Sequence, residues 1–214
     1  MKLYEAFSAR GYHTSLVTTF GIDFDTYESV ALPRLRGSGC SNNMVVLDHR
    51  MLTLALEATM PPPRFAGRFY TVSGASLSQG VYHPKVLLQI GKSQGRLIVG
   101  SANMTASGLA GNLEVAGEVV CDDSDSIERE IVADAWRFAL AQLDRAQGTI
   151  DRQVRWALER APWLRSALAK SVVSAPGDTD VAFLATGASV GIAARFVALL
   201  RSTPVARLVV VSPY

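Results

Sequence analysis

The chain has 214 residues, of which 49% are hydrophobic and 19% are charged, and its formal net charge is +2 at pH 7. This composition is typical of a globular chain and excludes an intrinsically disordered one. So small a net charge neither requires nor excludes a nucleic acid as partner, because a local basic groove is enough to bind one.

Apolar, β-prone runs alternate with helical patterns in the first third of the chain. Strand–helix–strand order with apolar strands predicts an α/β fold, in which a mixed β-sheet is flanked by helices. Asp23 or Asp25 is expected to cap the first helix, and Pro33 to lie near its end. We expect strands over 14–22, 43–49 and 69–74, helices over 23–35 and 51–59, and a proline-rich loop over 60–67.

The middle of the chain predicts a β-hairpin. Residues 81–90 are apolar and interrupted only by His83-Pro84-Lys85, and a second strand is expected over 96–100. The short polar turn between them favours antiparallel pairing, which would bring Asn103 back beside His83. A third strand is expected over 115–120.

Two helices are expected after these strands, over 127–146 and 150–170, the first capped by Asp125 or Ser126. The second is rich in arginine, and two interpretations of it stay open. A solvated face is favoured, because acidic residues interleave; a nucleic-acid-contacting edge is the alternative. The arginines are Arg152, Arg155, Arg160 and Arg165.

The last part of the chain repeats the opening pattern. A strand over 181–187, a helix over 189–202 and a strand over 207–214 are expected after a linker. We interpret residues 1–174 as a complete first repeat and 175–214 as the start of a second. The turn at 186–193 resembles that of short-chain dehydrogenases, but no acidic residue for a ribose follows, so an ordinary tight turn is favoured.

The pair His83-x-Lys85, followed by Gly100-Ser101-Ala102-Asn103, supplies the groups that phosphoryl transfer needs. They are a nucleophile or proton donor, a fixed positive charge, and donors for the non-bridging oxygens. Lys85 and the turn can neutralise charge, so no metal is required in principle. Glu114 can hold one imidazole nitrogen and fix its tautomer.

The H-x-K and G-S-x-N motifs, with Asn112-x-Glu114 after them, resemble the phospholipase D superfamily and look like its bacterial nuclease branch. The resemblance implies that His83 is the nucleophile or its acid partner. It implies that Lys85 and Asn103 bind the phosphate, that Ser101 assists and that Glu114 orients His83. The residues expected to contact the substrate are Tyr82, Gly100 and Thr105.

The implied activity is metal-independent hydrolysis of phosphodiesters, with DNA as the favoured substrate, a phosphohistidine intermediate, and duty in restriction or phage defence. Ile90 stands where many family members have Asp, and the spacing from Lys85 to the second motif is longer than in the lipases. Both departures disfavour a lipid. The alternatives are a phospholipase or phosphatidyltransferase, and a non-catalytic nucleic-acid-binding module of a larger defence complex.

The family uses two histidines that face each other. We therefore expect a second H-x-K motif beyond Tyr214, in missing sequence, or a homodimer in which a second copy supplies it.

The remaining signals are mostly negative. Cys40 and Cys121 have no C-x-x-C spacing and are expected to be free thiols. The three histidines show no metal-ligand spacing, no cofactor is expected, and Asp48-His49 is interpreted as a surface pair. With no signal core and no apolar run of membrane-spanning length, we expect a cytoplasmic protein that does not contact a membrane.

Overall fold

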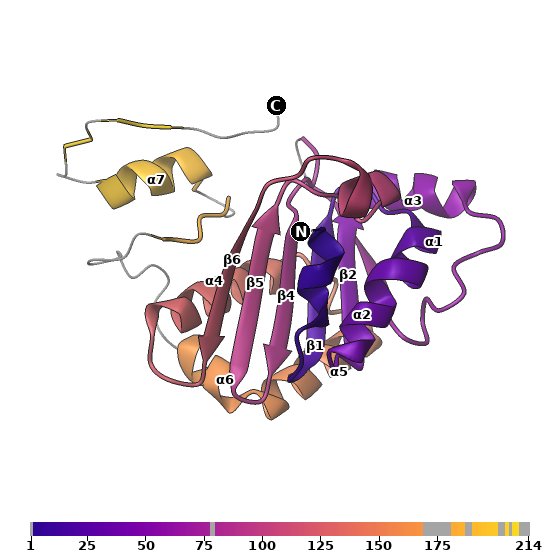
Figure 1. The fold of residues 1–214 in the computed structure, drawn as a ribbon, viewed down its shortest axis with the longest axis horizontal. Helices are drawn as coiled ribbons and strands as arrows, with labels where there is room; N and C mark the ends of the chain where they lie inside the picture. Colours follow the sequence, from indigo (N-terminus) through magenta and orange to yellow (C-terminus); the bar gives the residue numbers. More distant parts are fainter. Residues whose placement is uncertain are drawn as a thin grey trace.

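A computed structural model describes residues 2–77, 80–168, 181–186, 190–200, 204–205 and 207–209. Its centre is a six-stranded sheet in the order β3-β2-β1-β4-β5-β6 (Figure 1). Strands β1, β2 and β3 are parallel, whereas β4 pairs antiparallel with β1, β5 with β4 and β6 with β5. The predicted mixed sheet is thereby confirmed. The strands are β1 (Tyr12–Thr19), β2 (Asn42–Asp48), β3 (Thr71–Ala75), β4 (Val86–Gly91), β5 (Gln94–Gly100) and β6 (Ala116–Asp122).

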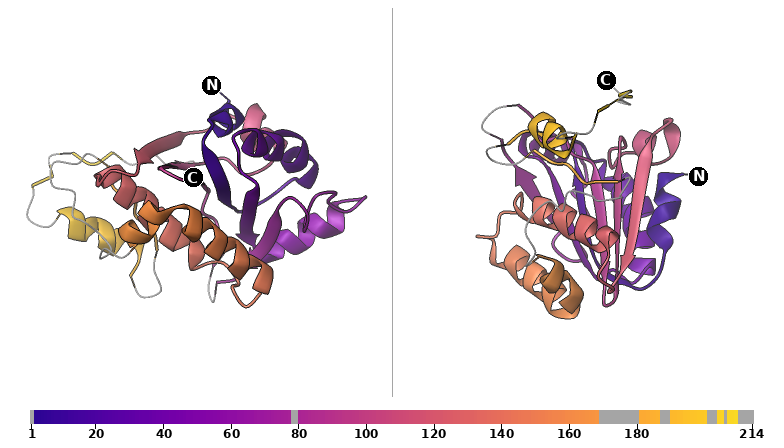
Figure 2. Two further views of the ribbon diagram at one scale, coloured as in Figure 1. Left: turned by 90° about the horizontal axis from the view of Figure 1, so that it is seen from below. Right: turned by 90° about the vertical axis from the view of Figure 1, so that its left-hand side faces the viewer.

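Helices cover both faces of the sheet, which confirms the predicted flanking layers (Figure 2). One face packs against α4 (Ile127–Leu140), α5 (Gly148–Arg160) and α6 (Pro162–Leu168). The other face packs against the helices of the first third of the chain. These are η1 (Leu3–Ser8), α1 (Phe24–Thr26), η2 (Tyr27–Ala31), α2 (Leu32–Gly37) and α3 (His49–Ala58); the remaining helices are η3 (Ser107–Gly111) and α7 (Ile192–Leu200).

The alternation of side chains along each strand separates the two cores. On β1, Leu16 faces the core under α4–α6 and Val17 faces the core under α1–α2. Both side chains are completely buried. A sheet buried on both faces explains why the strands are near-continuous apolar runs in the sequence. What stays accessible are the sheet edges and the two ends of the strands.

The predicted helix over 23–35 is formed by three joined elements, α1, η2 and α2. Asp23 caps it as predicted, since its Oδ1 accepts a hydrogen bond from the Thr26 N–H at 3.2 Å. The expectation that Pro33 lies near the end is wrong, because Pro33 stands in the first turn of α2 and the helix continues to Gly37. Proline lacks an N–H, and the wider π-type turn η2 accommodates the missing bond just before it.

Proline also explains two other differences from the prediction. The helix expected over 150–170 is two helices, because Pro162 starts α6 after α5 ends at Arg160. The strand expected over 81–90 begins only at Val86, because Pro84 has no N–H to donate to a ladder. Ser126, by contrast, caps α4 as predicted.

The C-terminal part confirms the predicted helix as α7 and corrects the strands around it. Residues 181–186 and 207–209 form no strand. Phe183 instead packs its ring on Phe138 of α4, with ring centres 5.9 Å apart. The proposed repeat boundary at 174–175, part of the expected 181–187 strand and most of the 207–214 strand lie outside the described residues, so the two-repeat organisation stays a prediction.

Cys40 and Cys121 are free and buried, as predicted. Burial raises the pKa of each thiol to about 11. No helix in the described part of the chain is both long and apolar enough to cross a membrane.

Candidate active site

The β4–β5 hairpin brings the two predicted motifs to one end of the sheet. His83 and Lys85 lie directly before β4, and Gly100 ends β5. Since the strands are antiparallel, the start of one meets the end of the other: Val86 pairs with Val99, and the Gly100 N–H donates to the Lys85 carbonyl at 3.1 Å. Two motifs separated in sequence are therefore joined by the backbone itself.

His83 and Lys85 contact each other through their side chains. The Lys85 Nζ lies 2.9 Å from His83 Nδ1 and 3.4 Å from Nε2. Because an ammonium group only donates, the Nδ1 that it contacts accepts, and the neutral imidazole carries its proton on Nε2. The ring of Phe20 covers the imidazole, with ring centres 4.4 Å apart. This holds the imidazole between a cation and an apolar surface.

The electrostatic surroundings favour a neutral His83. Burial lowers its imidazole pKa, the Lys85 charge lowers it further, and the Asp48 charge opposes them without reversing the shift. Burial also lowers the pKa of Lys85, against the opposing charge of Glu114. At neutral pH the site therefore presents an unprotonated ring nitrogen next to an ammonium group, which suits nucleophilic attack on a phosphate.

Ser101 and Glu114 form the second part of the site. The Ser101 hydroxyl donates a short hydrogen bond to Glu114 Oε2 and accepts one from the Val115 N–H at 3.0 Å. Asn112 Nδ2 donates to the other Glu114 oxygen at 3.3 Å. The serine and the carboxylate are thus brought together, and Glu114 acts electrostatically on Lys85. The predicted role of Glu114 in orienting His83 stays a prediction.

Asn103 is fixed from two sides. Its Oδ1 accepts from the Thr19 hydroxyl at 3.3 Å and from the Gly21 N–H at 3.4 Å. Its backbone is backed by Gly108, where an added Cβ would lie 2.4 Å from the Asn103 carbonyl oxygen. With Oδ1 used in this way, the Nδ2 protons are the donors that this amide has for a phosphate oxygen.

Asp48, at the end of β2, is not the surface residue that was expected. Its carboxylate is buried, with 6% of the residue exposed, and it accepts hydrogen bonds from backbone N–H groups of two segments. Oδ1 accepts from Arg50 at 3.0 Å and Met51 at 3.3 Å, which caps α3. Oδ2 accepts from the Tyr82 N–H at 3.0 Å, next to His83. Asp48 therefore fixes the segment that carries the imidazole.

The three residues predicted to contact substrate have structural contacts of their own. Tyr82 is 2% exposed and belongs to the core with Val86, so its ring does not lie on the accessible surface of the site. Gly100 packs against β6, where a Cβ would lie 2.8 Å from the Val115 carbonyl oxygen. Thr105 accepts from the Gly108 N–H at 3.2 Å and stabilises the η3 turn. Contact of Gly100 or Thr105 with a substrate stays a prediction.

Sequence reasoning did not identify the residues that hold the site together. Thr19 and Phe20 follow a buried strand, a position shared by many unremarkable residues, so neither gives a signal. Asp48 does give one, because an Asp immediately before a helical pattern is a typical N-cap. In the described parts of the chain, no three His, Cys, Asp or Glu residues gather where they could hold a metal ion.

No family model and no curated protein matches the chain. Three solved structures do. Yeast tyrosyl-DNA phosphodiesterase is 13% identical with a TM-score of 0.44, over 58% of this chain and 29% of that one. NucT from Helicobacter pylori is 14% identical with a TM-score of 0.44, over 66% and 85%. Nuc from Salmonella typhimurium, described as a phospholipase D family member, is 15% identical with a TM-score of 0.41, over 65% and 85%. The resemblance named from the motif is thus also found among solved structures.

Proposed function

We propose that this chain carries a half-site for metal-independent phosphodiester hydrolysis, with His83 as the nucleophile. One observation supports this most: the hairpin joins His83, in contact with Lys85 at 2.9 Å, to the turn that carries Ser101 and Asn103. A neutral imidazole beside an ammonium group and amide donors matches the needs of a pentacoordinate phosphorus with developing negative charge.

In the proposed reaction, the phosphate draws the Lys85 ammonium away from the imidazole and onto a non-bridging oxygen. The freed nitrogen lone pair of His83 forms a bond to phosphorus, and the bond from phosphorus to the leaving oxygen breaks. An acid of the opposite half-site protonates that oxygen. Water then attacks phosphorus, the N–P bond breaks, and His83 returns to its neutral form. Asn103 Nδ2 holds the second non-bridging oxygen.

The opposite half-site comes from a second copy of the chain or from sequence not present here. An exposed apolar rim beside Glu114 supports the second copy. Four large apolar side chains of this rim are between 40% and 101% exposed, more than isolated surface residues need. They are Val81, Val99, Leu113 and Val115.

We propose DNA as the substrate and restriction or phage defence as the role. The motif variant supports this choice, because it looks like the nuclease branch. A phospholipase is the second candidate, since the same apolar rim suits acyl chains. Phosphatidylcholine vesicles and DNA offered to the same preparation separate the two candidates, because only one is hydrolysed.

The test is cleavage of single- and double-stranded DNA in excess EDTA. The native chain is compared with His83→Ala and with His49→Ala, a matched control whose histidine is exposed on α3. We expect EDTA-insensitive cleavage by the native chain and the control, and none by His83→Ala. Cleavage that persists in His83→Ala, or that stops with EDTA, contradicts the proposed mechanism. A rate per molecule that falls on dilution supports the homodimer.

A further inference from the structure

A second group of charged side chains lies near the opposite end of the sheet from His83. It is called here the arginine–phenylalanine surface and consists of Arg36, Arg64, Phe65, Arg68 and Phe69. The guanidinium of Arg36 lies 3.9 Å from the Phe69 ring centre, that of Arg68 5.9 Å from the same ring, and that of Arg64 5.3 Å from the Phe65 ring. The two rings lie 5.2 Å apart, so three cations share one aromatic platform.

The loop that carries this surface is held in one conformation by Glu28. Its carboxylate accepts hydrogen bonds from the backbone N–H of Arg64 at 3.0 Å and of Phe65 at 2.8 Å, and from the Tyr70 hydroxyl at 2.8 Å. The Phe69 carbonyl accepts from Asn43 Nδ2 at 3.1 Å. A loop ordered before binding loses little entropy when a ligand arrives.

The charge of the surface is not neutralised by ion pairs within the described residues. Arg36, Arg64 and Arg68 are exposed, and none of them forms an ion pair there. The nearby Glu28 directs its oxygens to backbone N–H groups and to a hydroxyl instead. A single exposed Arg on an aromatic ring is ordinary packing, but three unpaired guanidinium groups on one platform repel each other unless an anion binds between them.

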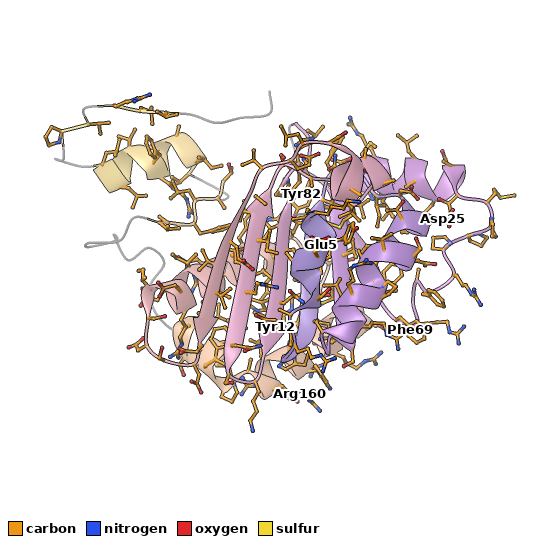
Figure 3. The ribbon with its side chains drawn as sticks, viewed as in Figure 1. Glu5, Tyr12, Asp25, Phe69, Tyr82 and Arg160 are labelled. Carbon is orange, nitrogen blue, oxygen red and sulfur yellow. The ribbon has the colours of Figure 1, made fainter. Side chains whose placement is uncertain are left out.

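We propose that the arginine–phenylalanine surface binds single-stranded nucleic acid. Guanidinium groups bind phosphate oxygens through paired N–H donors, and their planes and the phenylalanine rings stack on unpaired bases. Phe69 lies two residues before β3 and Tyr82 lies at the other end of the sheet (Figure 3). The length of β3 alone, about 3.3 Å per residue, keeps this surface outside the hydrolytic site. The binding requires no hydrolysis at His83.

Fluorescence anisotropy with a labelled oligothymidylate tests the proposal, using the full chain with His83→Ala so that the probe stays intact. The variant R36A/R64A/R68A removes the three cations, and R152A/R155A/R165A removes the same charge from α5 and α6. Each phosphate contact on a single strand contributes about 0.7 to the salt slope, so we expect the first variant to lower the slope by about 2 and to weaken low-salt binding at least about tenfold. The control is expected to bind like its parent.

A third variant, R36K/R64K/R68K, keeps the charge and removes the planar groups. We expect it to keep the salt slope and to lose the preference for a single strand over a duplex of the same length. Its thermal unfolding, measured beside the parent, shows that the fold is intact. An unchanged salt slope in R36A/R64A/R68A, an equal loss in the control, or duplex binding as tight as single-strand binding by the parent overturns the proposal.

The two proposals fail separately. Binding lost in R36A/R64A/R68A without any cleavage by the native chain leaves this surface supported and refutes only hydrolysis. EDTA-insensitive cleavage with unchanged binding in that variant refutes only this surface.

Discussion

Replacing Asp48 tests whether one buried carboxylate positions the nucleophile segment. Asp48→Asn is the informative change, because its two oxygens serve different segments: Oδ1 caps α3, and Oδ2 accepts from the Tyr82 N–H. Asn has one acceptor. If it keeps the two bonds of the cap, its Nδ2 donors face the Tyr82 N–H, and a buried donor loses its partner.

The expected cost follows from these contacts. An unsatisfied buried N–H costs about 1–3 kcal/mol, so Asp48→Asn is expected to lower the free energy of unfolding by about that amount. Asp48→Ala also loses the cap, which costs about 1 kcal/mol more. Ser126→Ala removes the cap of α4, far from the site, and is the control: it loses only the cap contribution and keeps activity.

Urea denaturation measures the stabilities, and initial rates of phosphodiester cleavage measure kcat and KM. We expect Asp48→Asn to lower kcat more than Ser126→Ala does at equal stability, since the His83 segment is displaced. Burial raises the pKa of the Asp48 carboxyl, but the N–H groups of Tyr82, Met51 and Arg50 lower it more, to below its ordinary 3.8. The native chain therefore gains this stability above about pH 4 and loses it at lower pH, and Asp48→Asn removes that dependence. A variant as stable and active as the native chain refutes the reasoning.

Two further predictions concern the groups around the phosphate. NMR titration is expected to give His83 a midpoint below 6.5, because burial and Lys85 both disfavour the imidazolium, and Lys85→Ala is expected to raise that midpoint; a midpoint that does not move contradicts the assigned contact. Gly108→Ala places a Cβ 2.4 Å from the Asn103 carbonyl oxygen and is expected to raise KM, whereas Gly111→Ala in the same turn meets nothing nearer than 3.7 Å and serves as the control. Equal KM values for the two variants contradict the role given to Asn103.

The local elements of the fold were predictable because their signals are local. Alternating apolar residues and a short polar turn define the β4–β5 hairpin, and that hairpin alone joins His83 and Lys85 to Ser101 and Asn103. The cap at Ser126 has the same local character. Where proline changed an element, at Pro84 and Pro162, the cause was visible in the sequence and its effect on the boundary was underestimated.

The supporting contacts were not predictable because they join distant residues. The hydrogen bond from Tyr82 to Asp48 spans 34 positions and that from Thr19 to Asn103 spans 84. A single sequence does not indicate which strands are neighbours, so it gives no means of pairing these residues. The apolar residues of 181–186 met the pattern of a strand, yet Phe183 packs on a helix, since an apolar run records burial and not the element that provides it.

Trapping the covalent intermediate tests the central claim most directly. The chain is mixed with a phosphodiester carrying a labelled phosphate, quenched in alkali, digested, and analysed by mass spectrometry. The account predicts label on the peptide that contains His83, stable to alkali, lost in acid, and absent from His83→Ala but present in His49→Ala. Turnover of the substrate with no label on His83, or with label on another residue, contradicts it.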